Sequence, residues 1–300
     1  METILIAGGS GIIGTYLTEI LRNRGYEVYI LTRNKDKASK QKHFLHWDID
    51  KGYIDEFDRA DHIVNLAGSG IAEGKWTKSR KKDILDSRIQ SSELLIKTIE
   101  ERQLTIKSYV SASAIGFYGD GGEQYLTEGD SVVTKEFLSD VCVAWEQAAL
   151  GAKGLVDHLS IIRIGTVLSP KGGALEKMAQ TIPLGVANYL GHGRQLISWI
   201  HLHDVSEIIV HAIEKNLTGI YNAVAPEVLT NKDFTKQLKD AINSKALLLP
   251  APAFGIKLVF GEMARVVLNS SNISSEKIRQ TGFSFEYPSL EKALGQLYPT

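Results

Sequence analysis

The sequence predicts an α/β fold in which helices cover both faces of a doubly wound, parallel sheet. Two observations carry this prediction. Short apolar segments rich in β-branched residues alternate with helical patterns from Thr3 to Ile164, an order typical of parallel strands joined by crossover helices. The first segment, residues 3–7, also runs directly into three glycines at a spacing of three, Gly8, Gly11 and Gly14, and then into an apolar pattern of helical period.

The glycines of the segment GGSGIIG predict a Rossmann-like dinucleotide site. Gly8 permits a tight turn, Gly11 lets backbone N–H groups approach a pyrophosphate, and Gly14 lets the helix pack against the sheet. The pyrophosphate is expected at the positive N-terminal end of that helix. The predicted contacts are Gly8, Gly9, Ser10, Gly11, Ile12, Ile13 and Gly14. A glycine-rich turn without a ligand is the alternative, which the strand–turn–helix order disfavours.

Composition excludes several classes of protein. Of the 300 residues 43% are hydrophobic, and 34 basic residues against 35 acidic ones give a net charge of −1. Without a basic stripe or a long apolar run we expect neither nucleic acid nor membrane as a partner. The single cysteine, Cys142, excludes an internal disulfide and a cysteine-based zinc site. The first strand follows Met1 at once, so we expect a cytoplasmic protein without a signal peptide.

The end of the second predicted strand, residues 27–31, indicates which dinucleotide binds. NAD sites of this kind place an acidic residue there, whereas this chain has Thr32, Arg33 and Asn34. A guanidinium suits a phosphate, so the prediction is NADP(H) with Arg33 on the 2′-phosphate; a solvated basic loop is the alternative. Further cofactor contacts are predicted at the ends of the third and fourth strands, at Asp48, Leu66, Ala67 and Gly68.

The fifth predicted strand, residues 107–113, brings two serines to one face because side chains alternate along a strand. We expect Ser111 to contact the cofactor. Ser113 is a candidate catalytic contact with the substrate, or else a cap at the strand end. Tyr118, just beyond, is a second catalytic candidate, or else a packed ring.

Substrate contacts are expected from three other segments. Lys75 and Trp76 lie in a polar loop, residues 71–82, where Trp76 is either part of a lid or a plug on the sheet. Arg88 follows on the next helix, and for Lys75 and Arg88 the alternative is a solvated charge. His192 and His201 are further candidate contacts. His201 and His203 have no acidic or histidine neighbours suited to a metal, so no metal site is expected.

The pattern changes after residue 168. We expect residues 1–168 to form the dinucleotide-binding domain, with about 196–226 returning to it. Residues 169–195 and 227–300 then form a smaller, mostly helical C-terminal substrate lobe. Its apolar segment, residues 247–268, is expected to be a helix packed on the lobe, with a contact between two copies in a homodimer as the alternative.

Several longer motifs identify a family. They are NLAG from Asn65, DSRI from Asp86, SASAIGFYG from Ser111, AWEQAA from Ala144, SWIHLHD from Ser198 and GEMARVVLNS from Gly261. With the glycine segment they resemble the extended short-chain dehydrogenases/reductases along the whole chain. More narrowly they resemble the NADP-binding "epimerase family" branch, whose members are often described as sugar-nucleotide epimerases or cell-division inhibitors.

The resemblance implies a nicotinamide-dependent oxidoreductase or isomerase, yet one motif departs from it. The larger superfamily carries a Tyr-x-x-x-Lys pair on the helix after the serine strand, with the tyrosine as acid/base. Aligning Glu146 with the acidic residue after that motif puts Leu138 and Cys142 at these two positions. Two hypotheses follow: an NADP(H)-dependent enzyme with another proton donor acting on a small polar or sugar-like substrate, or a catalytically silent NADP(H)-binding regulatory protein.

Overall fold

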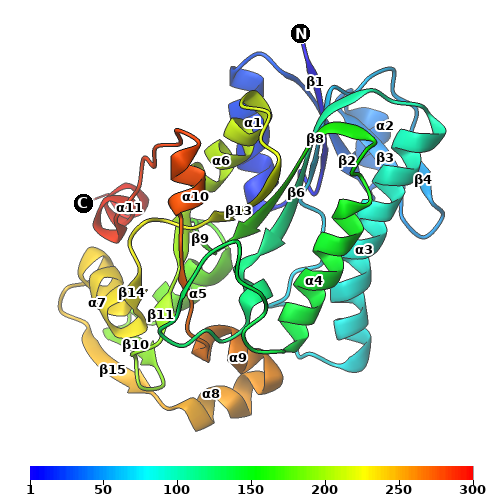
Figure 1. Ribbon diagram of the computed structural model, residues 1–300. Helices are drawn as coiled ribbons and strands as arrows, with labels where there is room; N and C mark the ends of the chain where they lie inside the picture. The colour runs from blue at the N-terminus through cyan, green and yellow to red at the C-terminus, as the bar shows by residue number, and fades with distance from the viewer. Residues whose placement is uncertain (300) are drawn as a thin grey trace.

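An eight-stranded sheet forms the centre of the computed structural model (Figure 1), which describes residues 1–299, Val259 and Phe260 by their backbone alone. In spatial order its strands are β13 (Gly219–Ala223), β8 (Val156–Ile164), β6 (Ile106–Ala114), β5 (His62–Asn65), β1 (Thr3–Ala7), β2 (Glu27–Thr32), β3 (Phe44–Asp48) and β4 (Tyr53–Ile54). Neighbouring strands pair parallel apart from β3 and β4. The predicted Rossmann-like doubly wound sheet is confirmed.

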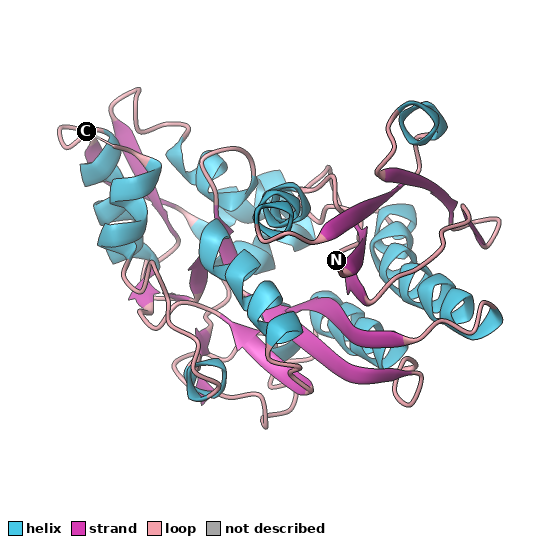
Figure 2. Ribbon diagram, turned by 90° about the horizontal axis from the view of Figure 1, so that it is seen from above, coloured by secondary structure: helices cyan, strands magenta, loops and turns pink. Residues whose placement is uncertain are grey.

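Helices cover both faces of this sheet (Figure 2). On one face lie α1 (Ile12–Asn23) and α6 (Leu202–Glu214), and on the other lie α3 (Lys78–Glu101) and α4 (Phe137–Leu150). Alternation along β1 explains the two cores: Ile4 and Ile6 pack toward α1 and α6, whereas Leu5 and Ala7 pack toward α3. Each fully buried isoleucine contributes roughly 2 kcal/mol of transfer free energy.

The remaining elements connect the strands or build the C-terminal part. They are α2 (Lys35–Lys40), η1 (Ile115–Tyr118), β7 (Tyr125–Leu126), β9 (Thr166–Leu168), α5 (Gly173–Ala179), β10 (Val186–Leu190), β11 (Leu196–Ile197), β12 (Trp199–His201), β14 (Leu229–Thr230), α7 (Asn231–Ile242), β15 (Leu247–Ala251), α8 (Ala253–Phe260), η2 (Gly261–Met263), α9 (Ala264–Leu268), β16 (Asn272–Ile273), α10 (Glu276–Gln280) and α11 (Leu290–Leu297). A separate hydrophobic cluster, which includes Leu175, Trp199, Phe234 and Leu294, holds α5, β12, α7 and α11 together.

The apolar segment after α7 corrects the expectation of a helix over residues 247–268. Leu247–Ala251 is the strand β15, which pairs parallel with β10. Pro250 and Pro252 explain the difference, because proline lacks the N–H that a helix interior requires. Helix begins only at Ala253, after the second proline.

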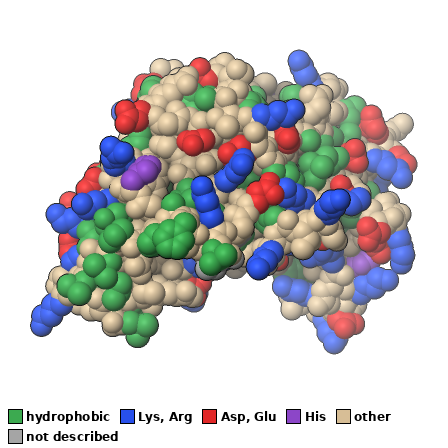
Figure 3. Space-filling model, turned by 90° about the horizontal axis from the view of Figure 1, so that it is seen from below, with side chains coloured by type: hydrophobic (Ala, Val, Ile, Leu, Met, Phe, Trp, Pro, Cys, Tyr) green, Lys and Arg blue, Asp and Glu red, His purple; other side chains and the backbone are tan. Residues whose placement is uncertain are grey.

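Hydrophobic side chains gather on the lower face of the lobe (Figure 3). Leu247, Phe254 and Leu258 are 64%, 77% and 81% exposed. The predicted homodimer contact at this surface stays a prediction. Among the described residues, none of the helices is long and apolar enough to cross a membrane.

Candidate functional site

The glycine turn brings backbone donors to the carboxyl edge of the sheet. Gly8 has φ +80°, and a Cβ there would lie 2.6 Å from the Leu66 carbonyl carbon. A Cβ on Gly14 would lie 2.4 Å from the Gly8 carbonyl oxygen, so only glycine allows α1 to approach the turn this closely. Gly11 precedes α1, and no side chain caps that helix. The first-turn N–H groups therefore have no partner within the helix and are available to an anion.

The residues of the turn differ in their exposure to solvent. Ser10, Gly11 and Ile12 are exposed, whereas Ile13 is half-buried against the core. Gly9 lies against Ile30, and its own Cβ would come within 2.7 Å of that side chain. The structure thus brings all seven predicted contacts together around one helix N-terminus.

The end of β2 carries an exposed arginine. Thr32 accepts a hydrogen bond from the Asn34 N–H at 3.2 Å, and Asn34 caps α2 by accepting from the Lys37 N–H at 3.0 Å. Arg33 is exposed and, within residues 1–299, forms neither a side-chain hydrogen bond nor an ion pair. Its guanidinium is therefore free to meet a ligand from the end of β2.

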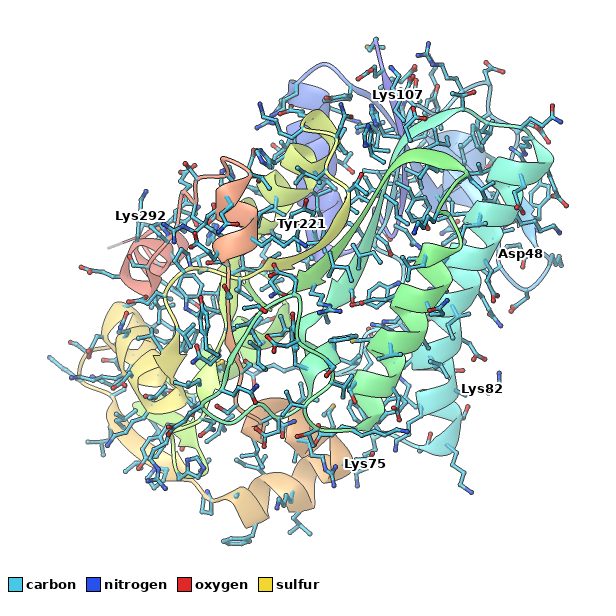
Figure 4. The ribbon with its side chains drawn as sticks, in the orientation of Figure 1. Asp48, Lys75, Lys82, Lys107, Tyr221 and Lys292 are labelled. Atoms are coloured by element: carbon cyan, nitrogen blue, oxygen red, sulfur yellow. The ribbon has the colours of Figure 1, made fainter. Side chains whose placement is uncertain are left out.

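The loop after β5 lies directly against the glycine turn. The Leu66 N–H donates to the Ala7 carbonyl at 2.8 Å, and the Ala67 N–H donates to the buried Asn65 side chain at 3.1 Å. Asp48 lies farther out, at the end of β3 (Figure 4), 3.4 Å from Lys51. It lines an open hollow of about 440 Å³ together with Lys35 and Tyr53.

A row of polar side chains crosses β6, β8 and β13, the three strands at one edge of the sheet. Ser113, Arg163 and Asn222 stand directly opposite one another in the register of β6, β8 and β13. Glu146 of α4 covers the row: Arg163 donates to its two carboxylate oxygens from Nε at 2.8 Å and Nη2 at 2.9 Å. Ser113 donates to the same carboxylate at 2.7 Å. All these residues are at least 95% buried, so the network faces the interior.

Tyr118 closes the network from η1. Its hydroxyl donates to Asn222 Oδ1 at 2.9 Å and accepts from Arg163 Nη1 at 3.0 Å. Burial raises the pKa of Tyr118, although the adjacent Arg163 opposes the shift. Tyr118 is 0% exposed, as expected for the alternative in which its ring is packed in the core. Ser111 is also 0% exposed and donates to the Ala112 carbonyl, and its predicted contact with the cofactor stays a prediction.

The usual acid/base pair is replaced by neutral groups. Leu138 and Cys142 both face Gly116, whose Cβ would lie 3.6 Å from the Leu138 Cβ and 3.7 Å from the Cys142 sulfur. Burial raises the pKa of Cys142 to about 12, which keeps the thiol protonated at neutral pH. Neither residue supplies a proton donor or a charge.

The predicted substrate contacts are spread over several environments. Trp76 donates to the Ile71 carbonyl at 2.8 Å and packs edge-on against Phe137 of α4 at 5.0 Å, and its predicted role as part of a lid or as a plug on the sheet stays a prediction. Lys75 is exposed in the same loop (Figure 4). Arg88 is half-buried on α3. Its Nη1 donates to the carbonyl of Ser69, in the loop after β5, at 3.1 Å.

The two predicted histidines lie elsewhere. His192 is exposed in a turn and accepts from the Arg194 N–H at 3.0 Å. His201 is 4% exposed, caps α6 by accepting from the His203 N–H, and stacks on Tyr287 at 4.0 Å. Burial lowers the pKa of His201 to about 4, so the ring is neutral. Its ring packs between α6 and the C-terminal segment, and the predicted contact of His201 with a substrate stays a prediction.

Sequence reasoning missed Arg163 and the role of Glu146. A visible signal existed, because Arg163 interrupts the apolar strand LSIIRI, and a charge in a buried strand requires a partner. Among the described residues, no cluster of histidine, cysteine or acidic side chains is arranged to hold a metal ion.

Comparisons with known proteins agree with this geometry. Residues 4–223 match the family model described as "NAD dependent epimerase/dehydratase family", and residues 251–297 match a domain of unknown function, DUF1731. An epimerase family protein of Mycobacterium bovis is 33% identical over 97% of this chain and 96% of its own length. The Bacillus subtilis epimerase family protein YfhF is 32% identical over 98% and 97%.

A solved structure covers the whole fold. The crystal structure of the human epimerase family protein SDR39U1 with NADPH superposes with a TM-score of 0.91 and 29% identity, covering 99% of each chain. The family model spans more than two thirds of the sequence and includes the glycine turn, the β5 loop and the serine strand. This chain therefore belongs to the NAD dependent epimerase/dehydratase family.

Proposed function

We propose that the protein binds NADP(H) along the carboxyl edge of its sheet and transfers a hydride between this cofactor and a small polar molecule. The observation that carries the proposal is the uncapped N-terminus of α1 beside an unpartnered Arg33. The human relative solved with NADPH supports the choice of dinucleotide. The protein is then an oxidoreductase, or an epimerase that returns the hydride to the same substrate.

Each part of the cofactor has a matching feature. The first-turn N–H groups of α1 hold the pyrophosphate, and Arg33 holds the 2′-phosphate through its planar donor fork. Thr32, Asn34 and Asp48 border the adenosine half, and Leu66, Ala67 and Gly68 lie along the nicotinamide half. When bound, the nicotinamide supplies the hydride. The chain's own residues bind and orient it.

A second candidate function is a catalytically silent NADP(H)-binding protein. It is favoured by a specific observation, because Leu138 and Cys142 occupy the helix positions of the acid/base pair and Ser113 donates its proton to Glu146. The two functions share cofactor binding and differ in hydride transfer. NADPH consumption in the presence of carbonyl compounds separates them.

Titration of the purified protein with NADPH, NADP⁺, NADH and NAD⁺, followed by fluorescence or calorimetry, tests the proposal. We expect NADPH to bind at least about tenfold more tightly than NADH, because a charge-assisted hydrogen bond contributes about 1.5–3 kcal/mol. Arg33→Asp should abolish this preference. Lys40→Asp, which makes the same charge change at the end of α2, should leave it within about threefold. Equal affinity for NADPH and NADH in the wild type would contradict the proposal.

A further inference from the structure

The guanidinium of Arg88 lies at the carboxyl end of the sheet, and one side of it has no hydrogen-bond partner among the described residues. Nη1 donates to the carbonyls of Ser69 at 3.1 Å and Ile84 at 2.8 Å, whereas Nε and Nη2 have no partner among the described residues. The guanidinium carbon lies 5.0 Å from the centre of the Trp145 ring. A Cβ on Gly68 would lie 2.9 Å from the same carbon. The loop after β5 and α4 thus fix the plane of the group.

Arg102, which directly follows the same helix, shows how this chain completes such a site. Its guanidinium also lies 5.0 Å from an aromatic ring, that of Phe57, and also donates to two backbone carbonyls, those of Ile54 and Asp55. Arg102 in addition has a carboxylate partner, Glu56, at 3.6 Å. Arg88 has the same construction without the carboxylate.

The surroundings of Arg88 offer no compensating charge. Burial lowers the pKa of Arg88, Cys142 opposes this shift and Arg80 adds to it. Cys142 itself is a protonated thiol, and Leu138, one turn earlier on α4, is apolar. Within residues 1–299, no acidic side chain forms an ion pair with Arg88. A half-buried guanidinium of this kind is completed by an external anion.

We propose that Arg88 binds the carboxylate of the substrate through Nε and Nη2, so that the substrate is a small carboxylic acid. This inference rests on the proposed function, because it places the ligand beside the cofactor loop at Gly68. The Nε–Nη2 edge is planar and matches the two oxygens of a carboxylate. The phosphates of the cofactor already have donors at α1 and Arg33. Arg88 is therefore a specificity-determining residue.

The proposal is tested by titrating the protein, with and without NADP⁺, with acetate, pyruvate, succinate and benzoate, and with acetamide and benzamide as neutral counterparts. Calorimetry measures affinity, and the fluorescence of Trp145 and the other tryptophans reports binding. We expect at least one carboxylate to bind, and its amide to bind at least tenfold more weakly. Arg88→Met should weaken the carboxylate at least tenfold and leave the Kd of NADPH within about twofold. Arg102→Met, the matched control, should leave both affinities unchanged.

The outcomes separate this inference from the proposed function. Loss of NADPH binding by Arg88→Met, equal binding of acids and amides, or no binding of any carboxylate would overturn the role of Arg88. If the wild type binds carboxylates through Arg88 but not NADPH, the proposed function fails instead. Should Arg88→Met unfold, Arg88→Lys keeps the charge and loses the fork, and it should still weaken the carboxylate severalfold.

Discussion

At the glycine turn the polar groups face outward without a partner, whereas at the end of β6 they face one another inside the protein. The first-turn N–H groups of α1 and the side chain of Arg33 are unused. Ser113, Glu146, Arg163 and Tyr118 are joined to one another by hydrogen bonds. In the family this chain resembles, the second region is the catalytic one. Here the start of α1 is exposed, and the network around Ser113 is part of the buried core.

The two regions differ because one is exposed to solvent and the other is buried. An open donor is costly only when it is buried, so unpaired groups at the turn are tolerated at the surface. A buried serine or tyrosine must be satisfied internally, and Glu146 and Arg163 serve this purpose. Substitutions in each region test whether the two behave separately.

Gly14→Ala should break the binding region. The added Cβ would stand 2.4 Å from the Gly8 carbonyl oxygen and 2.6 Å from the Gly9 Cα, so α1 must move away from the turn. We expect a loss of roughly 4 kcal/mol or more in the free energy of unfolding and loss of NADPH binding. Urea unfolding measures the first effect and titration the second.

Gly295→Ala is the matched control for that substitution. Gly295 lies in α11 with nothing within 4 Å of its Cβ position. Alanine favours a helix interior, so we expect a gain of about 0.5–1 kcal/mol. Equal effects of the two substitutions would show that packing at the turn is not what requires Gly14.

Glu146→Gln should disrupt the buried hydrogen-bond network of Ser113, Glu146 and Arg163. It leaves the buried Arg163 without its anion and Ser113 without a charged acceptor, and we expect a loss of about 3–5 kcal/mol in the free energy of unfolding. Asp86→Asn, which removes the exposed Lys82–Asp86 pair on α3, should cost less than about 0.5 kcal/mol. The folded fraction of Glu146→Gln should still bind NADPH within about twofold. A large loss of NADPH affinity would show that the two regions are energetically coupled.

His201 is buried between α6 and the C-terminal segment and makes stability depend on pH. The folded state holds His201 with a pKa of about 4, as burial dominates, Gln296 and Glu286 oppose it and His203 adds to it. The unfolded state binds a proton near pH 6.5. The stability contributed by neutral His201 is therefore complete above pH 6.5 and falls as the pH decreases toward 4, by about 3 kcal/mol.

Chemical denaturation at several pH values measures this dependence. His201→Asn keeps a side chain that caps α6 and removes the titration, so its stability should fall less steeply between pH 6.5 and 4. His62 and His211 also have lowered pKa values because of burial, so part of the dependence should remain in the variant. Identical slopes for wild type and His201→Asn would contradict the assignment.

The sequence was sufficient for features that depend on local pattern. The first strand β1, the glycine turn and the end of β2 follow from neighbouring residues. β15 was missed because its partner β10 lies some 60 residues earlier, and apolar content alone does not distinguish strand from helix.

The candidate catalytic residues show where sequence reasoning stops. Ser113 and Tyr118 were placed correctly near the end of β6, but their availability depends on Glu146 and Arg163, which are distant in the chain. No local pattern reveals that a serine donates inward. The family motif suggested an open catalytic strand, and tertiary packing closed it.

A crystal structure of the protein grown with NADPH tests the central claim most directly. We expect the pyrophosphate on the first-turn N–H groups of α1 and the 2′-phosphate within hydrogen-bonding distance of Arg33. The Ser113–Glu146–Arg163 hydrogen bonds should be unchanged. A structure in which NADPH binds elsewhere, or in which Ser113 leaves Glu146 to reach the nicotinamide, would contradict it.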